Sequence, residues 1–87
     1  MYKIRYSKKA MRDIHLLKAA HLDSKAKQLI SLIERNPYQN PPSYEKLLGE
    51  LAGKLSRRIN HQHRIVYEVF ENEKVVKIIS LWSHYEF

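Results

Sequence analysis

The stretch that decides the fold covers residues 55–67 and reads LSRRINHQHRIVY. Apolar and polar residues alternate on both sides of a polar break, which is typical of a β-hairpin. The alternation places Arg58 and Arg64 on the face opposite Ile59 and Ile65. Two guanidinium groups on one sheet face suit a phosphate, because each presents a planar fork of N–H donors.

The strands predicted for this hairpin are residues 55–60 and residues 64–70. Arg57 falls on the opposite, helix-facing side of the first strand, where we expect it to reach solvent or to pair with an acid. A turn at residues 71–73 leads into residues 75–82, which are almost continuously apolar. Such a run is typical of a strand that is buried on both faces at the centre of a sheet.

The N-terminal third of the chain predicts one strand and two helices. Residues 2–6 alternate like a strand, and Ser7 is a candidate N-cap for the helix that follows. A break near residues 21–23 separates this helix from a second one, which ends at Asn36-Pro37. Asp13 lies outside the apolar stripe of the first helix. The stripes contain Ala10, Ile14, Leu17 and His21 in the first helix, and Ala26, Leu29, Ile30 and Ile33 in the second.

The predicted fold class is α+β with the order β-α-α-β-β-β. A two-helix hairpin covers one face of a mostly antiparallel four-stranded sheet and leaves the other face open. Between the helices and the hairpin lies a proline-rich loop, residues 37–44, followed by a predicted helical turn at residues 45–48. A chain of 87 residues is expected to form a single domain, residues 1–87.

Composition favours an anionic partner. The chain has 16 Lys and Arg against 9 Asp and Glu, a formal charge of +7, and no Cys. This charge suits a polyanion, and the lack of Cys excludes disulfides and thiolate metal sites and fits a reducing cytoplasm. We expect neither a signal peptide nor a membrane span. His61 and His63 are predicted in the hairpin turn, where contact with nucleic acid or plain exposure is expected rather than a zinc site.

Residues able to cleave RNA without a metal are expected to converge on the open face of this sheet if the last strand lies next to the hairpin. Such cleavage needs a general base for the 2′-hydroxyl, a cation for the extra phosphate charge and an acid for the leaving 5′-oxygen. The candidates are Glu45 before the hairpin, Arg58 and Arg64 within it, and His84-Tyr85 after the last strand.

Each candidate also has a simpler interpretation. Glu45 can cap a turn, and Arg64 can form a surface ion pair with Glu50 or Glu68, which contributes little to stability. His84 can be an exposed imidazole. The placement of all candidates on one predicted surface is what favours a site.

Aromatic residues interleave with the basic ones. Tyr44 and Tyr85 are candidates for stacking on unpaired bases. Tyr67 and Trp82 lie in apolar strand runs and are expected in the core instead.

Several segments together resemble a known family. They are Tyr44-Glu45-Lys46-Leu47, Leu51-Ala52-Gly53, Ser56-Arg57-Arg58-Ile59-Asn60, His63-Arg64-Ile65-Val66-Tyr67 and His84-Tyr85. As a set they resemble the Txe/YoeB toxins, part of the RelE-like group of bacterial toxin–antitoxin systems. The resemblance spans nearly the whole chain and implies a small α+β fold like that of microbial ribonucleases.

The activity implied by the resemblance is a metal-independent mRNA endoribonuclease that acts in the ribosomal A site and uses no cofactor. Glu45 then matches the general base and Arg64 the phosphate-stabilising arginine, with Arg58 in support. His84 matches the general acid and Tyr85 the aromatic that positions substrate, although base and acid can be exchanged between members.

The implied partners are mRNA, the ribosome and a cognate antitoxin in the cytoplasm, with no membrane, in a homodimer or a toxin–antitoxin hetero-oligomer. Tyr44 and His63 are further substrate-binding candidates. One departure is that Glu86-Phe87 follow the His-Tyr pair. The alternative function is a non-catalytic basic module that binds RNA or an antitoxin.

Overall fold

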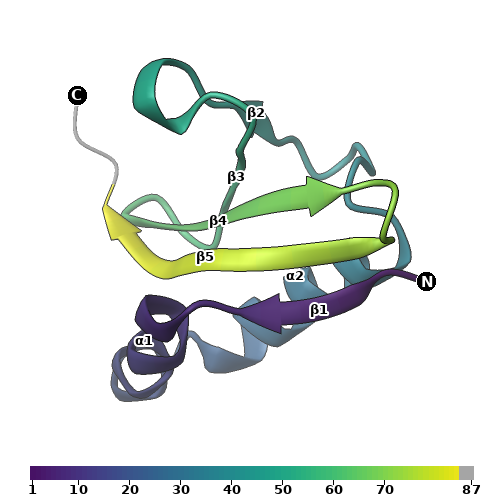
Figure 1. The fold of residues 1–87 in the computed structure, drawn as a ribbon. Coiled ribbons are helices and arrows are strands. Elements are labelled where there is room, and N and C mark those ends of the chain that lie inside the picture. Colours follow the sequence, from purple (N-terminus) through teal and green to yellow (C-terminus); the bar gives the residue numbers. More distant parts are fainter. Residues whose placement is uncertain (85–87) are drawn as a thin grey trace.

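The computed structural model describes residues 1–84, with side chains through Ser83. Its sheet has the strand order β1-β5-β4-β3-β2, in which β1 runs parallel to β5 and the other pairings are antiparallel (Figure 1). A 3₁₀ turn, Gly49–Leu51, separates β2 from β3. The α+β class is therefore confirmed. The helices and strands are β1 (Lys3–Tyr6), α1 (Lys8–Ala19), α2 (Asp23–Arg35), β2 (Glu45–Lys46), β3 (Leu55–Arg58), β4 (His63–Phe70) and β5 (Val75–His84).

The sheet has five strands within the described residues, rather than the four predicted. The extra strand is β2, where the sequence predicted a helical turn. Glu45 and Lys46 pair with Ser56 and Leu55 of β3, and the Leu47 N–H donates to the Lys54 carbonyl at 2.9 Å. Two residues are too few to show a period of two, so this strand exists because β3 offers it hydrogen-bond partners.

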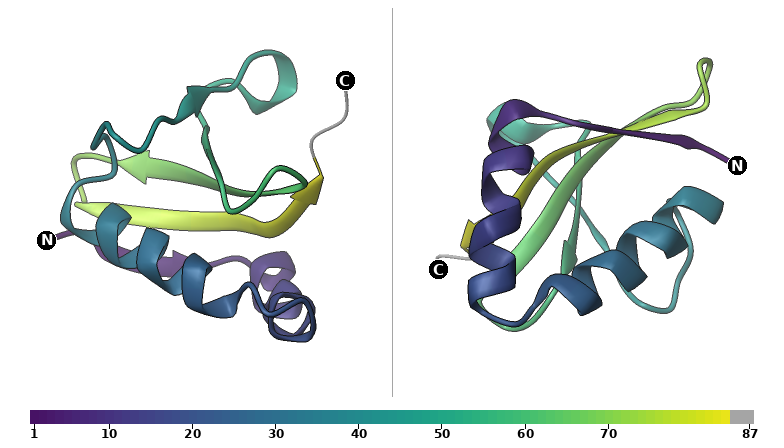
Figure 2. Two further views of the ribbon diagram at one scale, coloured as in Figure 1. Left: turned by 180° about the vertical axis from the view of Figure 1, so that it is seen from behind. Right: turned by 90° about the horizontal axis from the view of Figure 1, so that it is seen from below.

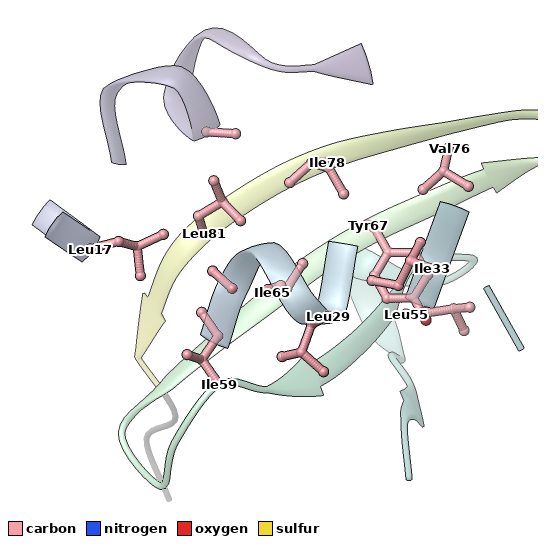
Figure 3. Close-up of a cluster of buried hydrophobic side chains, with 12 residues drawn as sticks. Leu17, Leu29, Ile33, Leu55, Ile59, Ile65, Tyr67, Val76, Ile78 and Leu81 are labelled. Carbon is pink, nitrogen blue, oxygen red and sulfur yellow. The ribbon is translucent and has the colours of Figure 1, made fainter. Parts of the chain in front are cut away.

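Both helices pack on one face of the sheet, and α2 lies across that face in Figure 2. Between the two layers lies the apolar core, whose labelled members come from both helices, from β3, β4 and β5, and from Ile59 directly after β3 (Figure 3). Neither helix in residues 1–84 is long and apolar enough to cross a membrane. The buried members of this core are Ala10, Leu17, Ala26, Leu29, Ile33, Leu55, Ile59, Ile65, Tyr67, Val76, Ile78 and Leu81.

Strand β5 lies inside the sheet but is buried mainly on its helix-facing side. Val76 and Ile78 are fully buried, whereas Lys77 between them is exposed. The prediction of burial on both faces was wrong, because the helices cover only one face of the sheet.

Arg57 does face the helix layer, as predicted, but it neither reaches solvent nor pairs with an acid. Its side chain is 1% exposed. Its two terminal nitrogens donate to the carbonyl oxygens of Pro37, Gln39 and Pro42 at 2.7–3.0 Å. Its Nε donates to the Tyr67 hydroxyl at 2.9 Å, which in turn donates to the Pro37 carbonyl at 2.7 Å. Burial raises the pKa of the Tyr67 phenol, although the adjacent guanidinium opposes the shift. Arg57 thereby fastens the proline-rich loop to the sheet.

The ladder between β4 and β5 is irregular where β5 approaches its end. Its register shifts twice around Val66, so β5 carries extra residues there (Figure 1). The Ser7 hydroxyl donates to the Ile79 carbonyl at 2.7 Å and accepts from the Ala10 N–H at 3.0 Å, which confirms Ser7 as the N-cap. The Ser7 hydroxyl thus caps α1 and forms a hydrogen bond with the irregular part of β5.

Asp13 supports the same part of β5, although the sequence pattern left it outside the apolar stripe. It is 5% exposed, and its Oδ2 accepts hydrogen bonds from the backbone N–H groups of Leu81 and Trp82, each at 3.1 Å. Burial alone would raise the pKa of this carboxyl, but the hydrogen bonds and the Lys9 ammonium at 2.7 Å outweigh it and lower the pKa. Asp13 therefore satisfies backbone donors that the irregular ladder leaves over.

Candidate active site

The candidate site lies on the open face of the sheet, where three strands bring side chains into one row. Arg58 of β3 is the direct cross-strand partner of Arg64 of β4, and Arg64 is the partner of Ser83 of β5. Residues paired in this way present their side chains on the same face. The prediction that Arg58 and Arg64 share a face is confirmed.

Arg64 is held in place by two neighbouring strands. Its Nη2 lies 3.2 Å from the Glu45 Oε1, and its Nη1 donates to the Ser56 hydroxyl at 2.9 Å. The Arg64 side chain is 5% exposed and that of Glu45 is 50% exposed. The acid partner is therefore Glu45 rather than Glu50 or Glu68. The result is a fixed guanidinium beside a carboxylate that solvent can reach.

Arg58 differs from Arg64 in that it is exposed. An exposed cation and a fixed cation side by side can play different roles at a phosphate site. The exposed group can meet an incoming anion, and the fixed group needs no reorganisation when charge develops on it.

His63 does not lie in the hairpin turn, as the sequence predicted, but opens β4 and is 5% exposed. Its ring stacks on that of Trp82, with centroids 3.7 Å apart and planes 18° apart. The turn lies earlier than expected, at residues 59–62, and the Asn60 side-chain oxygen closes it by accepting from the N–H groups of Gln62 and His63, at 2.9 and 2.8 Å. Within the described residues, no group of three or more His, Cys, Asp or Glu residues is arranged to hold a metal ion.

The remaining candidates are placed in part. The backbone of His84 pairs with that of His63, next to the Arg64–Ser83 pair. Tyr85 lies outside the described residues. Tyr44 is half-buried, and the Arg57 guanidinium lies over its ring, 4.9 Å from the centroid. Its ring therefore contacts the buried arginine, and its part in substrate binding stays a prediction.

Two contributors to this site were missed from sequence. Ser56 holds Arg64, and strand alternation could have found it, since it lies two residues before Arg58 on the same face. Trp82 was assigned to the core, yet it is half-buried and supports the His63 ring as well. No pattern in the sequence indicates that stacking pair, because it forms across two strands whose register is irregular.

Comparison with known proteins decides the family. The model for the YoeB-like toxin of bacterial type II toxin–antitoxin systems matches residues 6–85. The chain belongs to this family. Among curated YoeB toxins, that of Synechocystis sp. is 38% identical over 74 residues, which cover 85% of this chain and 77% of the relative. Toxin YoeB of Mycobacterium bovis is 40% identical over 58 residues, and the match spans 67% of this chain and 66% of that relative.

Solved structures of YoeB proteins share the fold. A YoeB/ParE toxin from Agrobacterium tumefaciens superposes with a TM-score of 0.84 at 29% identity, covering 95% of this chain and 99% of that one. A toxin chain from the heterotetrameric YoeB–YefM toxin–antitoxin complex of Staphylococcus aureus gives 0.79 at 34% identity, covering 98% and 99%. The YoeB dimer of the same organism gives 0.78 at 34%, covering 97% and 98%.

Proposed function

We propose that this YoeB-like toxin is a ribosome-dependent mRNA endoribonuclease that cleaves in the A site and so stops translation. The observation that carries the proposal is the Glu45–Arg64 ion pair beside the exposed Arg58. A carboxylate, a fixed guanidinium and an exposed one are the groups that metal-independent cleavage of RNA requires on one side of the phosphate.

In the proposed reaction, Glu45 accepts the proton of the 2′-hydroxyl as the 2′-oxygen bonds to the adjacent phosphorus. Arg64 and Arg58 stabilise the added negative charge on the phosphate. The bond from phosphorus to the 5′-oxygen breaks, and His84 donates a proton to that oxygen. The products are a 2′,3′-cyclic phosphate and a 5′-hydroxyl. Tyr85, Tyr44 and His63 are proposed to position the RNA.

The proposed biological setting follows from the family. A cognate antitoxin would neutralise the toxin by covering the active site, and the S. aureus complex supports this partner. The dimer of the S. aureus YoeB supports a homodimer as a further assembly. We further propose that the chain acts in the cytoplasm as a single domain, residues 1–87.

The proposal is tested by expressing the protein from an inducible promoter with and without its antitoxin. We expect growth arrest from the parent and relief of the arrest by Arg64→Ala and by His84→Ala. Arg12→Ala, which removes an exposed arginine from α1, is the matched control and should remain toxic. If Arg64→Ala and His84→Ala both arrest growth like the parent, the mechanism is wrong.

A second assay separates catalysis from simple binding. Programmed ribosomes are incubated with the purified toxin in the presence and in the absence of EDTA, and the 5′ ends of the mRNA are mapped. Cleavage in the A site that resists EDTA supports the proposed chemistry. Binding without cleavage supports the non-catalytic alternative, and cleavage that EDTA abolishes supports a metal-dependent enzyme.

A further inference from the structure

A second concentration of positive charge lies on the open face of the sheet, away from the Glu45–Arg64 pair. It surrounds a hollow of about 490 Å³ formed where β1, the start of β5 and the end of β4 meet. The residues that line this hollow are Lys3, Arg5, Phe70, Glu73, Val75 and Lys77. Three lining residues are basic and one is acidic, so the hollow favours an anion.

The hollow shares its face with the candidate active site. Arg5 of β1 is paired with Lys77 of β5, and Lys77 is paired with Glu68 of β4. Arg64, Glu68 and Phe70 are separated by even numbers of residues along β4, so their side chains lie on the same side of the sheet. One continuous sheet surface therefore connects the two regions.

The fold itself gives no reason for these charges. Arg5 and Lys77 are directly opposite each other, and like charges in that position destabilise a sheet. Among residues 1–83, no acid lies within ion-pair distance of Lys3, Arg5 or Lys77. Glu68, the neighbour that could neutralise Lys77, lies 3.6 Å from the Lys54 ammonium instead. Neighbouring positive charges that outnumber the nearby acids and form no ion pair with them are what an anionic ligand would compensate.

We propose that this basic hollow binds the sugar–phosphate backbone of single-stranded RNA, along the same strand that enters the active site. The proposal rests on the function proposed above. Phe70 is 37% exposed at the hollow and provides a surface on which a base can stack. A groove that combines cations with an exposed aromatic ring is typical of proteins that bind single strands without reading their sequence.

The spacing of the two regions defines which RNA can reach both. Arg64 and Phe70 are six residues apart on β4, which at about 3.3 Å per residue is roughly 20 Å. A trinucleotide bound at the active site would leave the hollow empty, whereas a strand of a dozen nucleotides would occupy both. The hollow should therefore add affinity for long RNA only.

The test uses RNA whose 2′-hydroxyls are methylated, so that binding is measured without cleavage. Fluorescence anisotropy compares the wild type with the double variant Arg5→Gln/Lys77→Gln, using a 12-mer and a 3-mer. The matched control is Lys25→Gln/Lys27→Gln, which removes two exposed charges from α2. Because the RNA cannot be cleaved, the result does not depend on whether the toxin is a ribonuclease.

We expect Arg5→Gln/Lys77→Gln to weaken binding of the 12-mer on the order of tenfold and to lower its salt slope by about 1.4, at roughly 0.7 for each lost phosphate contact. Binding of the 3-mer should be unchanged, and the control should affect both RNAs by less than about threefold. The melting temperature should equal or exceed that of the wild type, since a repulsion has been removed.

Four outcomes would overturn the proposal. The first is equal loss in the variant and the control, and the second is equal loss for the two RNAs. The third is a wild type that binds the 12-mer no better than the 3-mer. The fourth concerns the variant itself. It is either a melting temperature below that of the wild type, or a greater loss of affinity for polyglutamate or anionic lipid vesicles than for the 12-mer.

Discussion

Arg57 and Arg64 lie on adjacent strands of one sheet and are both almost fully buried, but they contact different kinds of groups. Arg57 faces the helices and donates to neutral acceptors, namely three backbone carbonyls and a phenol. Arg64 faces the open side and contacts the carboxylate of Glu45 and the hydroxyl of Ser56. The face of the sheet, and not the residue type or its burial, therefore separates a structural arginine from a candidate catalytic one.

The largest effect in this comparison is expected at Arg64. Arg64→Ala removes the fixed cation at the proposed phosphate position, and the cleavage rate on programmed ribosomes should fall by about 10²–10³. The mapped 5′ ends give the rate. A rate within threefold of the wild type would remove Arg64 from the reaction. Its melting temperature should fall less than that of the Arg57 variant, because Glu45 is half exposed and remains solvated.

Arg57→Ala is expected to act on stability instead. It leaves several buried acceptors without donors, so the free energy of unfolding should fall by about 3 kcal/mol and the melting temperature by roughly 12–24 °C. Thermal and urea denaturation measure this change. Arg57→Lys is the informative control, since a single ammonium cannot reach all of these acceptors and should not restore stability. A variant that melts within 3 °C of the wild type would contradict the assigned role.

Asp13→Asn tests the support of β5 from the helix side. The amide keeps the shape but loses the charge, so the variant should lose about 1–2 kcal/mol of stability at neutral pH. The pKa of Asp13 is lowered in the folded protein, so its contribution is complete above the pKa of the unfolded chain and disappears as the pH falls through the folded pKa. The difference in free energy of unfolding between wild type and variant, measured by urea denaturation, should therefore decrease below about pH 4. A difference that does not depend on pH would show that the charge is irrelevant.

Tyr67→Phe should have the smallest effect. It deletes one hydroxyl between Arg57 and the Pro37 carbonyl, and we expect a loss of about 1 kcal/mol, or roughly 4–8 °C in melting temperature. Thermal denaturation of Tyr38→Phe provides the comparison, because Tyr38 is 44% exposed and lies outside the buried network. Equal losses in the two variants would mean that the buried network adds nothing.

The sequence predicted those features that depend on local patterns, namely the alternation of a strand and the cap of a helix. The alternation at residues 55–67 predicted the hairpin and the shared face of Arg58 and Arg64, and Ser7 was recognised as an N-cap. It predicted the face of Arg57 but not its hydrogen-bond partners, because backbone carbonyls belong to every residue and leave no signature. The same reason hid Asp13, whose partners are backbone N–H groups 68 and 69 residues away.

The site was predicted less completely than the fold. Glu45 was placed on a helical turn, although it lies on a strand that only its neighbour β3 makes possible. His63 was placed in the hairpin turn, although the turn ends at residue 62, where the Asn60 side chain accepts from the Gln62 and His63 N–H groups. For Glu45 the missing information was a contact between segments, which composition and spacing do not encode, and for His63 it was a local side-chain hydrogen bond that shifts the turn by a few residues.

The parallel pairing of β1 with β5 has a consequence for how this chain is made. Strand β1 pairs with β5, and the side chains of Ser7 and Asp13 form hydrogen bonds with the backbone of residues 79–82. During synthesis, residues 3–13 cannot form these contacts until residues 75–82 have been made. A translating ribosome therefore has to make residues 75–82 before the sheet can close, so folding of this sheet is coupled to a late stage of synthesis of residues 1–84.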